Sequence, residues 1–158
     1  MQSIRPYRTA DLPILQELTA AAFDGVSIDQ GLEREFGPTS GRDWRWRKMR
    51  HIADDAARDP AGILVMQTVD GEIVGFISTW CDHEAGIGHI PNLVVAEGFR
   101  RTGCGRQLIE AALDRFRELG MSHARIETLV QNTAGHGLYE SLGFREIARQ
   151  IHFGMKLS

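Results

Sequence analysis

The segment NLVVAEGFRRTGCGRQLIEAALDRF, residues 92–116, constrains this chain more than any other part of it. An apolar run ends at Val95, two adjacent arginines and two closely spaced glycines follow, and a helical pattern begins near Gly103. Gly103 and Gly105 each cost about 1 kcal/mol relative to alanine in the first turn of a helix. The segment therefore predicts a strand, a loop and a helix, and folding alone gives little reason for both glycines.

The start of this helix is a predicted anion site. The first N–H groups of a helix have no partner inside it, and with the helix dipole they favour an exposed anion by about 0.3–1 kcal/mol and a partly buried one by up to about 2 kcal/mol. Glycine leaves those N–H groups open to a ligand, and Arg100, Arg101 and Arg106 add positive charge around them. The whole chain has a net charge of −3, so this basic cluster is local, and we expect no nucleic-acid partner.

Three common motifs are excluded. Gly103-Cys104-Gly105 is followed by Leu108 where a dinucleotide-binding fingerprint needs its third glycine. No GxxxxGK[ST] loop for a nucleoside triphosphate occurs in the chain. His83-Glu84 has no second histidine at helical spacing, which removes the usual zinc-protease motif.

The cysteines and the N-terminal residues limit the classes of protein that the sequence is compatible with. Cys81 and Cys104 have no metal-ligand spacing, so we expect reduced thiols, no metal and a cytoplasmic location. The N-terminus lacks the apolar core of a signal peptide and no run reaches membrane-spanning length, so we expect no membrane association. The 158 residues fit a single domain, residues 1–158.

The periodicity of the chain predicts alternating strands and helices. We expect strands or hairpins at 2–7, 62–81, 86–95, 123–130 and 144–157, helices at 11–23, 42–60, 104–119 and 133–143, and a loop with one or two helical turns at 25–41. An antiparallel first half joined to a right-handed crossover predicts a mixed α/β sheet with helices on its faces.

Several residues mark expected details of these elements. Asp11 is expected to cap the first helix, and Asp70-Gly71 suits a tight primed turn in the hairpin. Pro91 inside a strand predicts a bulge or an interruption of the strand ladder. The buried stripes are expected to be Leu12, Leu15, Leu18 and Ala22 in the first helix, and Trp46, Met49, Ala53 and Ala56 in the second.

Two blocks of sequence resemble the GNAT superfamily of N-acetyltransferases. VAEGFRRTGCG, residues 95–105, is similar to the acyl-CoA loop of that family, whose core R/Q-x-x-G-x-G/A corresponds here to Arg100 through Gly105. NTAGHGLYESLGF, residues 132–144, is similar to the family pattern N-x-x-A-x-x-x-Y-x-x-x-G-F, with Gly135 in place of alanine. The resemblance covers residues 72–145, and two motifs in this order are far more specific than one.

The resemblance implies a GNAT-like acyl-CoA N-acyltransferase fold, with a central mixed sheet of about six to seven strands flanked by about four helices. It implies acetyl-CoA as co-substrate and an amine of a small molecule or peptide as acceptor. The pantetheine arm would lie between strands that part, at 90–95 and 124–130. The cofactor diphosphate would lie on the main chain of the loop, with Arg100 on its rim, at Arg101, Thr102, Gly103, Cys104, Gly105 and Arg106.

The resemblance also implies the catalytic groups. The backbone N–H of Val95 would stabilise the oxyanion, and Tyr139 would donate a proton to the leaving thiolate. Asn132 would contact the pantetheine, or it would cap its own helix, and both roles are compatible. His89 is our choice of general base, because histidine titrates near neutral pH; its alternative role is a solvent-facing residue at a strand end, and the other base candidates are Asp82, His83 and Glu84.

Acceptor specificity in the family usually comes from the regions corresponding to residues 23–60 and 147–154. Trp46 and Trp80 are candidates for the acceptor pocket, with neighbouring arginines for a carboxylate or phosphate, although an amphipathic helix with Trp46 in the core explains the same pattern. The competing function is a catalytically inactive acyl-CoA-binding module that acts as a sensor or partner domain. A purely structural interaction domain conflicts with the glycine-rich loop. Homodimers through the C-terminal strands are common in the family, but no feature of this sequence supports one.

Overall fold

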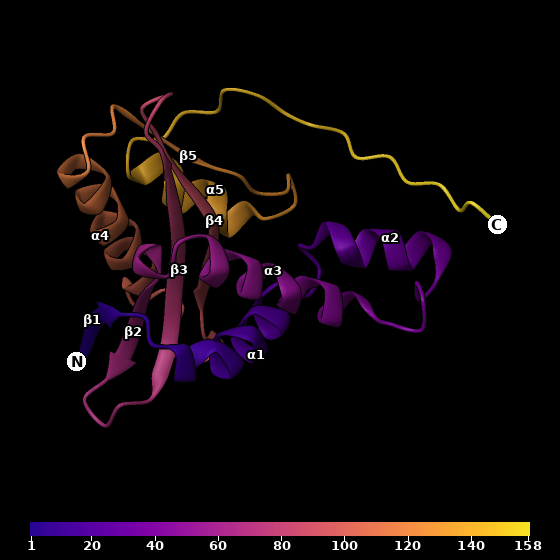
Figure 1. Cartoon of the computed structure of the whole chain (residues 1–158), viewed down its shortest axis with the longest axis horizontal. Helices are drawn as coiled ribbons and strands as arrows, with labels where there is room; N and C mark the ends of the chain where they lie inside the picture. The colour runs from indigo at the N-terminus through magenta and orange to yellow at the C-terminus, as the bar shows by residue number, and fades with distance from the viewer.

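A five-stranded mixed sheet forms the centre of the structure, a computed structural model that describes residues 1–158 (Figure 1). The strands follow the chain order across the sheet, and the first four are antiparallel to their neighbours: β1 Gln2–Pro6, β2 Leu64–Thr68, β3 Ile73–Asp82, β4 Ile87–Val95 and β5 His123–Ile126. β5 returns parallel to β4. The predicted mixed α/β sheet is confirmed.

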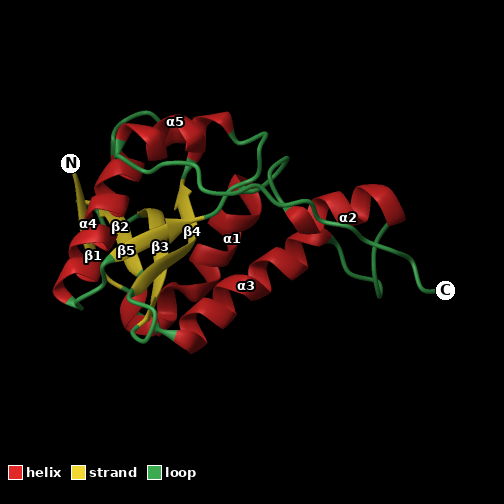
Figure 2. Cartoon of the chain, turned by 90° about the horizontal axis from the view of Figure 1, so that it is seen from above, coloured by secondary structure: helices red, strands yellow, loops and turns green.

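Five α-helices surround this sheet, and α2 lies beyond the end of α3, away from the strands (Figure 2). They are α1 Leu12–Ala22, α2 Ile28–Phe36, α3 Trp44–Arg58, α4 Cys104–Glu118 and α5 Thr133–Ser141. α1 and α3 pack over one face, on a core that includes Leu15, Ile52, Ile63, Val65, Ile73, Phe76 and Val94. α4 packs on the other face, where its side chains Leu108, Ile109, Ala112 and Phe116 form one core with Met66, Val74, Ile77 and Ile90 of the strands. None of the helices combines the length and apolar character that crossing a bilayer requires.

The sheet is smaller than the predicted six to seven strands because residues 144–158 form no strand. Their apolar residues alternate as a strand would require, but this row is exposed, with Phe153 92% accessible. The segment runs away from α5 and passes α2, where Gly154 lies beside Leu32 and Phe36 (Figure 1). The predicted final strand or hairpin is therefore wrong, since alternation indicates only that a segment is able to pair, and here no neighbouring strand pairs with it.

Two helical predictions also need correction. The segment at 25–41, predicted as a loop with one or two helical turns, contains the nine-residue helix α2, whose Ile28, Leu32 and Phe36 recur every four residues on one side. In α3 the buried tryptophan is Trp44, at 3% exposure, whereas Trp46 is 37% exposed. The expected burial of Trp46 is wrong, because the buried side of α3 carries Trp44 and Ile52, and Trp46 lies outside it.

Asp11 has a different role from the predicted cap. Its carboxylate accepts hydrogen bonds from Nη1 and Nη2 of Arg5 at 2.8 and 2.9 Å, and from the amide of Arg8 at 2.8 Å. The side-chain hydrogen bonds from Arg5 hold the pKa of Asp11 below its ordinary value. The pair ties β1 to the turn that precedes α1.

The β2–β3 hairpin turns where expected but with another geometry. Gly71 has φ +86°, and its N–H donates to the carbonyl oxygen of Thr68 at 3.0 Å. Asp70 has no positive φ, so the turn is a type I turn followed by a left-handed glycine, and not the predicted primed turn.

The bulge predicted at Pro91 is confirmed. Ser78 lies opposite Asn92 and Trp80 lies opposite His89, so one residue of β3 faces two residues of β4. Because of this extra residue, the Asn92 side chain points to the α1–α3 face while Ile90, two positions earlier, packs on the α4 face.

Candidate active site

The two parallel strands at the edge of the sheet part at the bulge. β4 pairs with β5 only from Ile87 to Ile90, and β5 ends at Ile126. β4 continues to Val95 and pairs there with β3 alone. The β4 main chain after Pro91 is therefore free of strand pairing on its β5 side.

The main chain at Val95 faces this unpaired edge. The amide of Ala96 donates to the carbonyl oxygen of Val74 at 2.8 Å, and inter-strand hydrogen bonds alternate along an antiparallel pair. The N–H and C=O of Val95 consequently point away from β3. The carbonyl oxygen accepts a hydrogen bond from Nε of Arg100 at 3.2 Å, which folds this arginine back over the end of β4.

The N-terminus of α4 presents unpaired amides next to this edge. Gly103 occupies the cap position with φ +89°, and the first helical bond runs from the Gln107 amide to the Gly103 carbonyl at 3.0 Å. The amides of Cys104, Gly105 and Arg106 have no backbone or side-chain acceptor. This end of α4 is therefore able to bind an anion through its main chain.

The structure shows why glycine occupies both positions, for local reasons that the sequence did not reveal. Gly103 has the left-handed conformation that side chains disfavour. A Cβ on Gly105 would lie 3.1 Å from Cδ2 of Leu138, so glycine allows α4 and α5 to approach closely. Cys104 is buried, with its Sγ 3.2 Å from Oγ1 of Thr102, and so its thiol points into the protein.

The arginines around this helix end differ in their contacts. Nη2 of Arg106 donates to Oγ of Ser141 at 2.7 Å, and its Nη1 lies 3.7 Å from Glu110, so Arg106 joins α4 to α5. Arg101 has φ +61° and no ion-pair partner within 4.0 Å. Its guanidinium is therefore available to a ligand at the helix end.

Tyr139 lies on α5 and packs against the α4 core. Its ring meets Phe144 edge-on with centroids 6.2 Å apart, and its hydroxyl makes no hydrogen bond within the protein. Burial raises the pKa of Tyr139 to about 12, so the phenol keeps its proton at neutral pH. Asn132 caps α5, accepting from the Gly135 amide at 3.2 Å and donating to Oγ1 of Thr128 at 2.8 Å.

The structure places His89 and Trp80 at the other end of β4. Their rings stack with centroids 4.1 Å apart, and Arg58 covers the tryptophan at 4.9 Å. Burial, with a contribution from Arg125, lowers the pKa of His89. His89 lies six positions before Val95, about 20 Å along a strand, so the predicted base and the predicted oxyanion donor are too far apart to act at one reacting centre.

The remaining base candidates lie farther still. Asp82 ends β3, and His83 and Glu84 belong to the turn between β3 and β4, at the same end of the sheet as His89. Trp80 lines a cavity of about 340 Å³ at this end. The choice of His89 as base and of Trp80 as an acceptor contact is therefore at odds with the geometry around Val95.

A buried polar network that sequence reasoning missed joins α3 to the bulge. Nδ2 of Asn92 and Oγ of Ser78 each donate to Oδ2 of Asp55 at 2.7 Å. Nζ of Lys48 donates to Oδ1 of Asn92 at 3.0 Å and lies 3.9 Å from the ring centroid of Phe23. Burial lowers the pKa of Lys48. The available signal was one asparagine in the otherwise apolar run IPNLVV.

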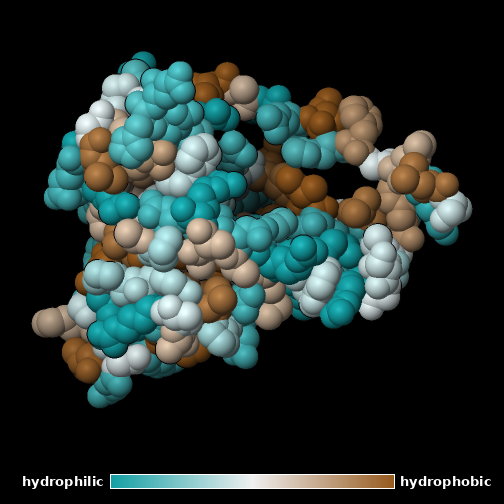
Figure 3. All heavy atoms as spheres, in the orientation of Figure 1, coloured by the Kyte–Doolittle hydropathy of each residue, from teal (hydrophilic) through white to brown (hydrophobic).

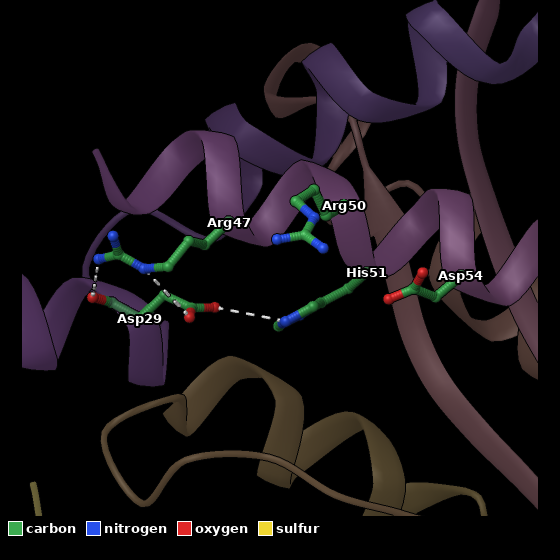
Figure 4. Close-up of a pocket in the computed structure, with 5 residues that line it drawn as sticks. All are labelled: Asp29, Arg47, Arg50, His51 and Asp54. Atoms are coloured by element: carbon green, nitrogen blue, oxygen red, sulfur yellow. Dashed lines mark hydrogen bonds and ion pairs between the residues drawn. The ribbon is translucent and has the colours of Figure 1, made fainter. Parts of the chain in front are cut away.

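A charged cavity of about 230 Å³ lies along α2 and α3 (Figure 4). Its wall consists of Asp29, Arg47, Arg50, His51 and Asp54. In Figure 3 hydrophilic residues gather along α3, and the surface is hollowed beneath the C-terminal segment. No cluster of three or more His, Cys, Asp or Glu side chains able to hold a metal ion occurs in the structure.

Comparison with known proteins gives one consistent family. Residues 26–144 match the acetyltransferase (GNAT) family. The chain is 29% identical over 96 residues to an N-alpha-acetyltransferase of Sulfurisphaera tokodaii, covering 54% of this chain and 58% of that protein. It is 34% identical over 86 residues to a mycothiol acetyltransferase of Streptomyces avermitilis, covering 54% of this chain and 28% of that protein. The chain thus matches less than two thirds of the length of either relative.

The fold has a close counterpart among solved structures. The PaiA N-acetyltransferase from Thermoplasma acidophilum, solved in complex with coenzyme A, superposes with a TM-score of 0.72 at 19% sequence identity. The match covers 92% of this chain and 90% of that one.

Proposed function

Because the chain belongs to the acetyltransferase (GNAT) family, we propose that it transfers an acetyl group from acetyl-CoA to a primary amine by direct attack of the amine on the thioester. One observation carries this proposal: the unpaired amides at the start of α4 lie next to the edge where β4 and β5 part. The start of α4 would bind a diphosphate, and the unpaired edge of β4 beside it would bind the arm attached to that diphosphate. The acceptor is a small molecule or a peptide.

The cofactor diphosphate fits the main chain of the loop. The amides of Cys104, Gly105 and Arg106 would donate to it, and a partly buried anion at such a helix end gains up to about 2 kcal/mol. Arg101 has no other ionic partner and would add a charge-assisted hydrogen bond. The pantetheine arm would then follow the unpaired edge of β4.

The reacting carbonyl would lie at Val95. As the amine nitrogen bonds to the carbonyl carbon, negative charge develops on the oxygen, and the Val95 N–H at the unpaired edge would stabilise it. When the C–S bond breaks, the thiolate needs a proton. Tyr139 would donate it, because its pKa of about 12 keeps the phenol protonated.

The acceptor ammonium must lose its proton before it attacks. Glu127 is the first residue after β5, where the two strands part, and its carboxylate is 75% exposed beside Arg125 at 3.2 Å. Ala124 and Ile126 pack on the α4 core, so the alternation of a strand directs Glu127 to the α1–α3 face. We infer that Glu127, directly or through water, is the base in place of His89.

The test combines binding and turnover. Calorimetric titration with coenzyme A should show one site, weakened by Arg101→Gln but not by Arg145→Gln, since Arg145 follows α5 in the exposed C-terminal segment. Thiol release from acetyl-CoA is then followed with a library of amines. Absence of coenzyme A binding would overturn the proposal, and binding without turnover of any amine would instead support an acyl-CoA-binding module.

A further inference from the structure

One carboxylate on α3, the helix that crosses β3 and β4 in Figure 1, bonds both strands at the bulge. Oδ2 of Asp55 accepts one hydrogen bond from Oγ of Ser78 on β3 and another from Nδ2 of Asn92 on β4, each at 2.7 Å. Ser78 and Asn92 lie opposite each other, and the next pair across the bulge is Trp80 with His89. Asp55 therefore holds the two strands together at the point where their register changes.

Both donors to Asp55 are buried and depend on its carboxylate. Ser78 is 1% exposed and Asn92 is 4% exposed. Asp55 is the hydrogen-bond acceptor of both, and water cannot replace it at a buried position, so losing this acceptor would leave two buried donors unpaired. Nζ of Lys48 donates to Oδ1 of Asn92 at 3.0 Å. The amide of Asn92 is therefore held at both its oxygen and its nitrogen, in one orientation.

The orientation of Asn92 is tied to the direction of the main chain that follows it. From Asn92 to Val95, β4 pairs with β3 alone, and successive residues point their N–H groups alternately toward β3 and away from it. The Ala96 amide bonds to β3, so the Val95 N–H points to the unpaired edge. A slip of β4 by one residue would turn the Asn92 side chain to the α4 core and the Val95 N–H toward β3. The bond between Asn92 and Asp55 opposes this slip.

Main-chain pairing alone specifies the bulge weakly. Pro91 has no N–H, so the ladder is interrupted next to Asn92 in either register. The strand lacks a second neighbour there as well, because its pairing with β5 ends at Ile90. A side-chain bond beside the bulge is therefore able to decide where the extra residue lies.

We propose that Asp55 is a positioning residue for the proposed acetyl transfer: through Ser78 and Asn92 it fixes the bulge in β4, and so the direction of the Val95 N–H. This inference rests on the proposed function, since it concerns the donor that would stabilise the oxyanion. Asp55 acts through its two hydrogen bonds and transfers no proton. An uncharged side chain that accepts the same two bonds should therefore replace it.

The experiment compares Asp55→Ala, which removes the acceptor, with Asp55→Asn, which keeps an oxygen able to accept both bonds. In Asp55→Ala, kcat should fall about 10- to 100-fold, because a displacement of about 1 Å is enough to misplace an oxyanion donor. The KM for acetyl-CoA should stay within about threefold, since the proposed diphosphate site is the start of α4. Asp55→Asn should keep kcat within about threefold of the wild type, because the two bonds remain.

Two controls separate position from stability. Asp54→Ala makes the same change one residue away, at an exposed position, and should keep the wild-type kcat. Asp11→Asn breaks the pair with Arg5 of β1, which β2 and β3 separate from β4, so it should lower the melting temperature without lowering kcat. If Asp55→Ala does not fold, Ser78→Ala replaces it: this variant removes one of the two bonds and should lower kcat by a smaller factor.

Amide hydrogen exchange, followed by NMR, measures the strand register without turnover. In the wild type the Ala96 amide, which bonds to Val74, should exchange at least about tenfold more slowly than the unpaired Val95 amide. Asp55→Ala should reduce this difference. Asp55→Asn, Asp54→Ala and Asp11→Asn should keep it.

Three results would overturn the inference while leaving acetyl transfer intact. They are an unchanged exchange pattern in Asp55→Ala, a wild-type kcat in that variant, or an equal loss of kcat in Asp55→Asn and Asp55→Ala. If no amine is acetylated, the exchange pattern alone decides. A pattern lost in Asp55→Ala and kept in Asp55→Asn supports the role of Asp55 in fixing Val95 although the proposed transfer fails, and an unchanged pattern refutes it.

Discussion

The proposed general acid can be tested by removing a single oxygen atom. Tyr139→Phe keeps the ring that packs edge-on against Phe144 at 6.2 Å and breaks no hydrogen bond within the protein. The free energy of unfolding should therefore change by no more than about 0.5 kcal/mol at neutral pH. A positioned acid accelerates a reaction by about 10²–10⁴-fold, so kcat should fall at least about 100-fold, or roughly 2.7 kcal/mol of barrier.

The assay measures coenzyme A thiol release at saturating acetyl-CoA and acceptor, with thermal melting of each variant. The KM for acetyl-CoA should stay unchanged, because the proposed cofactor site is the main chain at the start of α4 and does not include the phenol. Tyr7 is the other tyrosine of the chain and packs against the core on the α1–α3 side, so Tyr7→Phe is the matched control. It should retain wild-type turnover.

A kcat within about threefold of wild type, in a Tyr139→Phe protein that melts normally, would refute the reasoning and leave the thiolate to be protonated by water. A parallel loss of kcat and thermal stability would mean that the ring is misplaced, and the acid role would then lack support from this variant. Only loss of turnover with an intact fold and intact coenzyme A binding agrees with the proposal.

Three further predictions concern the backbone and the pH response. Gly103→Ala and Gly120→Ala both add a Cβ in a left-handed conformation, at φ +89° and +78°, so thermal melts should show that each lowers the unfolding free energy by about 1–2 kcal/mol. Only Gly103→Ala should raise the KM for acetyl-CoA in steady-state kinetics. Asp11→Asn should cost about 3–5 kcal/mol by breaking the pair with Arg5. Because the pKa of Asp11 is lowered, the wild type keeps this stability at neutral pH and loses it as the pH falls below about 4, so urea melts of the two proteins should converge in acid. Because the pKa of Tyr139 is raised to about 12, the wild type should lose stability relative to Tyr139→Phe as the pH rises above 10, by on the order of 2 kcal/mol near pH 12. If melts of the two proteins do not diverge in this pH range, the phenol is not buried.

Local patterns in the sequence predicted the elements that local chemistry determines. The helix predicted at 104–119 forms as α4, which buries Leu108, Ile109, Ala112 and Phe116 on one side, and Gly120, with its positive φ, follows its end. The bulge at Pro91 was likewise predictable, since proline cannot donate to the strand ladder. Each of these features depends on a residue and its near neighbours.

The features that depend on distant parts of the chain were predicted poorly. Trp44 and Trp46 are two residues apart on one helix, and only the packing of α3 against the rest of the chain decides which one is buried. His89 is close to Val95 in sequence, but an extended strand carries the two residues far apart. The segment at 144–158 has the alternation of a strand, yet pairing requires a partner that its own sequence does not specify.

The asparagine in β4 explains how these distant parts form one candidate site. Its side chain bonds to Asp55 and Lys48 of α3, while the main chain three residues later presents Val95 to the unpaired edge. The helix α3 and the proposed oxyanion donor on β4 are thus joined through buried hydrogen bonds between two regular elements, and not through a loop. Such support holds reacting groups in a fixed relation, which direct attack of an amine on a thioester requires.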